Sequence, residues 1–256
     1  MLSIKDIDTF LNTFPIQKDE IVPFAAKAGG GWLDPDTAVE FCKGCGISLS
    51  ETDGYLHLKT STNSIEDTVF CFVDIETNGS NPKNSQTIEI GAVKYKNGVF
   101  TESFERLIKS DHLPANISEI TGITMADLKN GEKEKDALAA FREFLQDGLF
   151  CAHSVDFDFS FLSHRMEYNG LFPLLNRRLC TLDLAKKTLK ASKYGLKTLK
   201  HELSLGEDIH HRALPDAKSS ALVFEAAIQA MKQKPNSIEE FIAFSKSKNI
   251  EAESPF

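Results

Sequence analysis

The stretch that decides the fold is FCFVDIETNG, from Phe70 to Gly79. It is apolar as far as Asp74, which predicts a buried strand that ends near Glu76. Residues two apart on a strand project from the same face, so the two carboxylates would lie close together. Two like charges on a buried strand are unfavourable unless a cation lies between them. The alternative is that the strand ends at Ile75 and that Glu76 opens a solvated turn, and this stretch alone does not decide between the two.

The composition is that of a globular protein. The chain has 256 residues, 41% of them hydrophobic and 26% charged, which allows one good-sized domain and a small one. No segment approaches the length of a membrane span, and the start MLSIKDIDTF lacks the basic and apolar regions of a secretory leader. The five cysteines are odd in number and indicate reduced thiols. We therefore expect a cytoplasmic protein that does not associate with membranes.

The charge distribution bears on nucleic-acid binding. The net charge of −8 is unlike that of a protein that coats nucleic acid. It allows an enzyme that acts on nucleic acid, because metal-binding carboxylates contribute to the total. The segment from Arg177 to Lys200 is different, since eight basic residues accompany one acid, Asp183. This segment is either a solvated helical face or a surface for a polyanionic ligand, and the lack of acidic partners favours the ligand.

Residues 1–62 predict a small module of three helices and a hairpin, similar to a winged helix. Ser3 and Asp34 are suited to cap the first and third helices, and Pro23 makes the second irregular. ISLSETDGYLHLKT alternates around a Thr-Asp-Gly turn, which indicates the hairpin. The third helix, DPDTAVEFCKGCG, carries three acids and one lysine. Protein docking or packing therefore fits this module better than binding in a DNA groove.

Cys42 and Cys45 form a C-x-x-C pair in the third helix. Structural zinc needs four ligands, and His57 is the one further candidate nearby in the sequence. We expect these cysteines to pack rather than to bind metal.

Residues 63–232 predict an α/β domain. Three antiparallel strands come first, and helix–strand alternation follows, which indicates a mixed central sheet flanked by helices. A KNG turn joins the second strand to the third. The expected strands are about Val69–Glu76, Ile88–Lys96 and Phe100–Lys109.

Residues 233–256 form a C-terminal helix and tail. The helix is amphipathic, and its apolar residues are Ile238, Phe241, Ile242 and Phe244. We expect this helix to pack onto the preceding domain, and docking to a partner protein is the alternative.

Two further patterns place acids at helix starts. In AHSVDFDFSFL a helix follows a short strand, and Asp156 or Asp158 would also suit an N-terminal cap. In HHRALPDA, Pro215 suits the first turn of a helix, which puts Asp216 in that turn and His211 on the preceding loop. Each pattern is weak on its own.

Taken together, DIETNG, HSVDFDFSFL and HRALPDA resemble the three motifs of the DnaQ-like DEDDh 3′–5′ exonucleases. The proofreading, or epsilon, subunits of bacterial DNA polymerase III are the group that the chain resembles most. IEIGAV and ITGIT also occur in the order that this family shows, and the resemblance covers residues 69 to 232. It implies an RNase H-like exonuclease fold for this part of the chain and says nothing of the N-terminal module.

The resemblance also implies the site residues. Asp74 and Glu76 match the first motif, and Asp158, rather than Asp156, matches the second because it follows a phenylalanine. In the third motif His211, rather than His210, precedes the matching aspartate, Asp216. The four matching carboxylates would hold two divalent cations, Mg²⁺ or Mn²⁺, and His211 would act as general base.

The implied activity is the removal of nucleoside 5′-monophosphates from single-stranded or frayed 3′ ends of DNA, as proofreading for a replicative polymerase. The catalytic subunit of that polymerase would be the protein partner. A stand-alone or RNA-trimming exonuclease, or a non-catalytic adaptor, are the alternatives. Thr77, Thr121 and Phe157 are the expected substrate contacts. Ser154 replaces the usual Asn of the second motif, and Thr121 stands where many epsilon subunits have a His, so the handling of the terminal nucleotide stays open.

Overall fold

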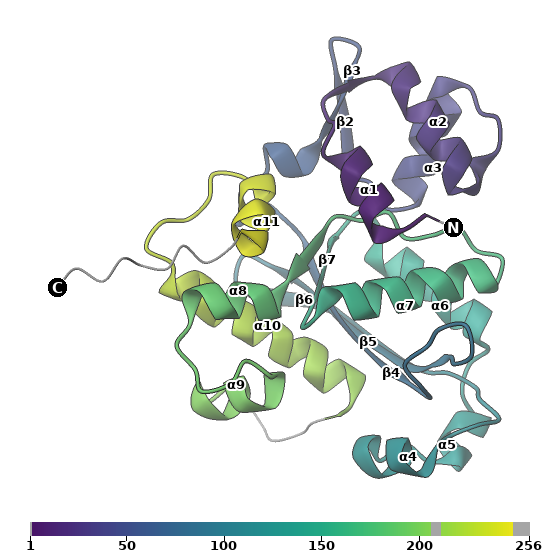
Figure 1. The fold of residues 1–256 in the computed structure, drawn as a ribbon, viewed down its shortest axis with the longest axis vertical. Coiled ribbons are helices and arrows are strands. Elements are labelled where there is room, and N and C mark those ends of the chain that lie inside the picture. Colours follow the sequence, from purple (N-terminus) through teal and green to yellow (C-terminus); the bar gives the residue numbers. More distant parts are fainter. Residues whose placement is uncertain (1, 206–210, 248–256) are drawn as a thin grey trace.

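The computed structural model describes residues 2–205 and 211–247 (Figure 1). Within these ranges the larger part of the chain forms a five-stranded sheet in the order β6-β5-β4-β7-β8. The pairs β4–β5 and β5–β6 are antiparallel, whereas β4–β7 and β7–β8 are parallel. The predicted mixed sheet of an α/β fold is therefore confirmed. The strands are β4 (Phe70–Thr77), β5 (Thr87–Lys96), β6 (Val99–Leu107), β7 (Leu149–Ala152) and β8 (Arg178–Cys180).

Side-chain alternation along β4 decides where its carboxylates lie. Phe72 is on one face of the sheet, where its ring centroid lies 5.1 Å from that of Phe224 in helix α10 (Ala213–Ala230). Because side chains alternate, Asp74 and Glu76 continue the Phe72 series on the α10 face. The strand extends beyond both carboxylates, so the alternative of a solvated turn is wrong.

Helices cover both faces of the sheet (Figure 1). Helices α6 and α7 pack against one face, in an apolar cluster that includes Val73 of β4. On the other face, α8 and α10 contribute Leu184 and Phe224 to a second cluster, which includes Phe72. The bounds of these helices and of α9 are α6 (Glu134–Leu145), α7 (Val155–Tyr168), α8 (Thr181–Thr188) and α9 (Leu196–Glu202).

Three short helices were not predicted from the sequence, namely α8, α4 (Ala115–Thr121) and α5 (Met125–Lys129). They have eight, seven and five residues, and so few residues give little helical periodicity. A different signal was present for α5, because Thr124 and Asp127 form a capping box at its start.

The N-terminal elements agree with the predicted three helices and hairpin. Ser3 forms a capping box with Asp6, and the Asp34 side chain accepts a hydrogen bond from the backbone N–H of Thr37. The second helix is irregular, as Pro23 predicts, and consists of three short turns of different type. The bounds are α1 (Ile4–Leu11), β1 (Ile16–Gln17), η1 (Lys18–Ile21), α2 (Val22–Ala25), η2 (Ala26–Gly30), α3 (Pro35–Gly44), β2 (Leu49–Thr52), β3 (Tyr55–Leu58) and η3 (Lys59–Ser61).

The N-terminal elements share a core with the large sheet. Ile7 of α1 lies in the same apolar cluster as Phe159 of α7, and Leu175 N donates to Cys45 O at 2.8 Å. Gly46 has a positive φ of 107°, and a Cβ there would lie 2.0 Å from Oδ1 of buried Asn176. A glycine is therefore required where the two parts meet. The division of the chain at residues 62 and 232 stays a proposal.

The C-x-x-C pair is buried in this shared core. Burial raises the pKa of Cys42 to about 12 and that of Cys45 to about 11. Both side chains are buried among apolar neighbours, which agrees with the expected packing role.

The C-terminal helix α11 (Ile238–Lys246) packs onto the domain, as predicted. It buries Ile238, Phe241 and Ile242 in the cluster that includes Phe224. Glu239 of α11 accepts hydrogen bonds from Arg177 and from Thr60 of η3, so α11 is also bound to η3. No helix in the described ranges is long and apolar enough to span a bilayer.

Candidate active site

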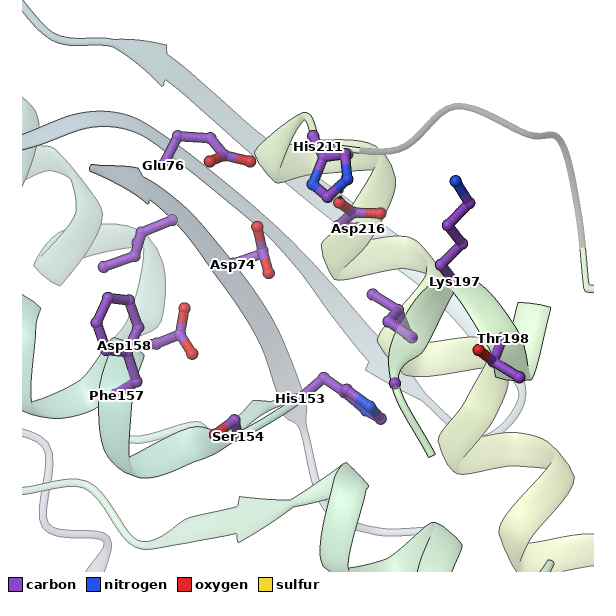
Figure 2. Close-up of a pocket in the computed structure, with 13 residues that line it drawn as sticks. Asp74, Glu76, His153, Ser154, Phe157, Asp158, Lys197, Thr198, His211 and Asp216 are labelled. Atoms are coloured by element: carbon purple, nitrogen blue, oxygen red, sulfur yellow. Dashed lines mark hydrogen bonds between the residues drawn. The ribbon is translucent and has the colours of Figure 1, made fainter. Parts of the chain in front are cut away.

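The four predicted carboxylates come from three separate elements and lie in one pocket of about 560 Å³ (Figure 2). Asp74 and Glu76 project from the end of β4, Asp158 from the first turn of α7, and Asp216 from the first turn of α10. His211 lines the same pocket from the loop before α10. The structure therefore brings together all five residues that the motifs single out.

Three of these carboxylates form a compact group. One oxygen from each of Asp74, Glu76 and Asp216 lies within 4.8 Å of the other two. Asp158 lies outside this group but faces the same pocket. The Oδ2 atom of Asp216 accepts a hydrogen bond of 2.8 Å from His211 N, whereas its buried Oδ1 has no hydrogen-bond partner among the described groups. A cation would satisfy a buried carboxylate oxygen that has no hydrogen-bond donor, and these hard oxygen ligands fit a divalent one.

The electrostatics of the site indicate the same need. Burial raises the pKa of Asp74 well above its ordinary value, and the charges of Asp158 and Glu76 raise it further. Burial and the neighbouring carboxylates also raise the pKa of Glu76 to about 7, and burial raises that of Asp158 to about 8. Protonation or a bound cation would relieve this repulsion.

Gly91 allows Asp216 to approach Asp74. In the β4–β5 register Gly91 lies opposite Asp74, and the start of α10 crosses β5 at this point. A Cβ at Gly91 would lie only 2.1 Å from Leu214 N, so no larger residue fits without moving the helix. Glycine here is therefore a condition for the close group of carboxylates.

An ion pair between buried Glu89 and partly exposed Arg212 holds the start of α10 in place. Glu89, which is 0% exposed, lies opposite Glu76 in the sheet. Its oxygens accept hydrogen bonds from the Arg212 guanidinium at 2.6 and 3.0 Å and from Ala213 N at 2.9 Å. Because a charged carboxylate is stable in the interior only when it is paired and hydrogen-bonded, these contacts fix the first turn of α10 against β5.

His211 lies on the loop before α10, as the H-x-x-x-x-D spacing predicts. It has a positive φ of 60°, which is uncommon for a residue other than glycine. Figure 2 shows its ring beside Asp216 at the rim of the pocket. His210, the alternative in the sequence, lies outside the described residues.

The start of α7 distinguishes the two acids of the second motif. Ser154, with a φ of 90°, precedes the helix. Asp158 is 5% exposed and lines the pocket, whereas Asp156 is exposed and does not line it. The placement agrees with the motif, which selects Asp158.

Of the three predicted substrate contacts, Phe157 lines the pocket, and Thr77 and Thr121 do not. Phe157 is 43% exposed and forms one wall of the pocket. Thr77 ends β4 and does not line the pocket. Thr121 is buried, and its hydroxyl is engaged locally, donating to Ile117 O and accepting from Ile123 N. The substrate-binding role of these three residues stays a prediction.

The pocket is also lined by polar residues that were not among the predicted site residues, and these include His153, which begins the motif HSVDFDFSFL, Lys197 and Thr198. Lys197 belongs to the basic segment noted in the sequence, which was the available signal. The sequence gives no means of choosing this lysine from its neighbours.

Comparison with known proteins covers the part of the chain that carries the candidate site. Residues 71–224 match the RNase T family, described as exonuclease. PolC-type DNA polymerase III of Thermotoga maritima is 36% identical over 188 residues, which cover 72% of this chain and 14% of that protein. The corresponding protein of Staphylococcus haemolyticus is 30% identical over 177 residues, which cover 68% of this chain and 12% of that protein. The chain thus spans a small part of these relatives.

Solved structures share the fold. Escherichia coli exonuclease I in complex with a dT13 oligonucleotide has a TM-score of 0.57 and 20% identity, with coverage of 65% of this chain and 42% of that one. Exonuclease X in complex with 5′-overhanging duplex DNA has a TM-score of 0.55 and 20% identity, with coverage of 69% and 99%.

Proposed function

Because the chain belongs to the DnaQ-like RNase T family of exonucleases, we propose that it removes nucleoside 5′-monophosphates from the 3′ ends of DNA in a metal-dependent reaction. One observation carries the proposal. Asp74, Glu76 and Asp216 bring carboxylate oxygens within 4.8 Å of one another, and Asp158 and His211 face the same pocket. This donor set has the composition of a two-metal hydrolytic site.

Each residue has a separate role in this proposal. Asp74, Glu76 and Asp216 would hold a divalent cation next to the attacking water, and Asp158, together with Asp74, would hold the second cation. Mg²⁺ or Mn²⁺ would supply a more acidic water and would stabilise the charge on the leaving 3′-oxygen. His211 takes the proton as the water oxygen attacks phosphorus. The bond from phosphorus to the 3′-oxygen then breaks, which releases a nucleoside 5′-monophosphate and leaves a new 3′-hydroxyl on the strand.

A proofreading role is the finer part of the proposal. It is supported by the names of the PolC-type polymerases that the chain resembles over residues of the exonuclease fold. The substrate and the protein partner distinguish the two forms of this proposal. An epsilon-like subunit would act beside a polymerase, whereas a stand-alone exonuclease would act by itself on DNA or RNA. The filled set of carboxylates argues against a non-catalytic adaptor.

Hydrolysis of a 3′-labelled DNA primer tests the proposal. We expect release of labelled nucleoside 5′-monophosphate with Mg²⁺ or Mn²⁺, none with EDTA, and faster release from a mismatched than from a paired terminus. A matched RNA should be degraded more slowly. The Asp74→Ala protein, purified in the same way, is the control for a contaminating nuclease. A preference for RNA would support the trimming alternative, and inactivity on both substrates would overturn the proposal.

A further inference from the structure

The pocket is acidic on all sides but one. Its carboxylates lie on β4, α7 and α10, and the remaining wall is formed by residues 195–198 at the start of α9. Lys197 on this wall is the one lysine or arginine among the described residues that line the pocket. In Figure 2 its side chain extends from the wall on the Asp216 side, and Phe157 is on the opposite side of the carboxylates.

The wall that carries Lys197 is anchored to the domain. His153 Nε2 lies 2.7 Å from Tyr194 O, and its Nδ1 lies 3.0 Å from the Thr181 hydroxyl. Both ring nitrogens are therefore engaged, which sets the orientation of the ring. Leu199, two residues after Lys197, is fully buried in a small apolar cluster between α8, α9 and α10. Lys197 thus extends from a backbone that is fixed on both sides.

Lys197 is exposed and has no partner among the described residues. Lys186 and Lys187 of the basic segment are engaged, since Lys186 lies 3.9 Å from Asp183 and Lys187 donates to Ser247. Lys190 and Lys193 are exposed like Lys197, but neither of them lines the pocket. No ion pair joins Lys197 to a described carboxylate that lines the pocket, so its ammonium group lies beyond ion-pair distance of each of them. Lys197 is therefore available to a ligand, and an anionic group of that ligand would be attracted by its positive charge.

We propose that Lys197 binds a backbone phosphate of the substrate strand next to the scissile one. This inference rests on the proposed exonuclease function. The scissile phosphate would be neutralised by the cations held by the carboxylates, but the next phosphate lies outside their reach and is repelled by the net charge of −8. A lysine at the rim offsets this repulsion, and Phe157 on the opposite wall offers a ring for stacking of a base. The pocket thus selects a strand over a single nucleotide ester.

The test compares two substrates that differ in the neighbouring phosphate. One is a single-stranded thymidine oligonucleotide, and the other is thymidine 5′-p-nitrophenyl phosphate, which has a single phosphodiester. Lys197→Ala should raise KM for the oligonucleotide about 5- to 10-fold, with a smaller change in kcat and a smaller loss on the ester. The slope of log KM against log salt concentration should fall by about 0.7, as expected for one phosphate contact on a single strand. Lys197→Arg should restore most of the affinity.

Lys190→Ala is the matched control, because Lys190 is an exposed lysine of the same segment that does not line the pocket. It should leave KM and the salt slope unchanged. Equal effects of Lys190→Ala and Lys197→Ala would overturn the proposal and indicate a non-specific attraction of the strand by the positive charges of the segment. An unchanged KM for the oligonucleotide in Lys197→Ala would also overturn it. If the wild-type protein hydrolyses neither substrate, the proposed function fails. Binding of the labelled oligonucleotide in Ca²⁺, measured by fluorescence anisotropy, then tests Lys197 by itself, and equal affinity of the wild type and Lys197→Ala would overturn it.

Discussion

Gly91→Ala tests whether the approach of α10 to β5 controls the site. A Cβ at Gly91 would lie 2.1 Å from Leu214 N, and ordinary van der Waals contact begins at 3.4 Å. The first turn of α10 must therefore move away from β5 by about 1.3 Å. Asp216 is in that turn, so its carboxylate moves away from Asp74 by a similar distance.

The expected effects follow from this displacement. Misplacement of a reacting group by about 1 Å costs roughly 10²-fold in rate, so kcat of Gly91→Ala should fall about 100-fold. Overpacking of an interior typically costs about 1–3 kcal/mol, and the free energy of unfolding should fall by that amount. The affinity for Mg²⁺ should also fall, because one of the grouped carboxylates is displaced.

The assay is release of labelled nucleotide from a single-stranded primer, with thermal unfolding and an Mg²⁺ titration of the same samples. Gly44→Ala is the control, since no heavy atom lies within 4 Å of a Cβ at that position. It should retain wild-type activity and stability. A folded Gly91→Ala protein with kcat within about threefold of wild type would refute the argument that close contact between helix and strand sets the geometry of the carboxylates.

Three further outcomes are expected. Asp158→Asn should lower kcat by orders of magnitude, whereas Asp156→Asn should keep kcat near that of the wild type and cost at most about 1 kcal/mol of stability, because it removes a negative charge from the first turn of α7. The reverse order, in the nuclease assay and in melts, would move the second motif by two residues. His211→Ala should lower kcat about 10²- to 10⁴-fold while Mg²⁺ still binds, and an unchanged kcat would exclude His211 as the proton acceptor. In EDTA the thermal midpoint should fall as pH rises from about 4.5 to about 7, because the raised pKa of Glu76 favours the native state only while Glu76 is protonated. Mg²⁺ should remove this fall, and a midpoint that is independent of pH in EDTA would contradict the unfavourable burial of Glu76.

Local patterns in the sequence were sufficient for much of the fold. The apolar run before Asp74 predicts β4, and alternation places both carboxylates on one face. Pro215 predicts the start of α10 to within two residues of the observed Ala213. Such signals are local, because each depends on the geometry of one strand or one helix turn. The motif spacing also selected Asp158, which the structure places in the pocket.

Other features depend on contacts between distant residues and have no local signal. The glycine of IEIGAV is an ordinary strand glycine until α10, more than 120 residues later, packs against it. Lys197 is one of eight basic residues in its segment, and only the fold shows which of them lines the pocket.

The core shared by the N-terminal elements and the large sheet has a thermodynamic consequence. Ile7 and Leu11 of α1 belong to the same apolar cluster as Phe159, so neither part can unfold without exposing the interior of the other. The described chain should melt in one cooperative transition, with equal calorimetric and van't Hoff enthalpies. A protein that bound the N-terminal elements would therefore be held in a fixed orientation relative to the carboxylates, and its binding would determine the direction in which the pocket faces.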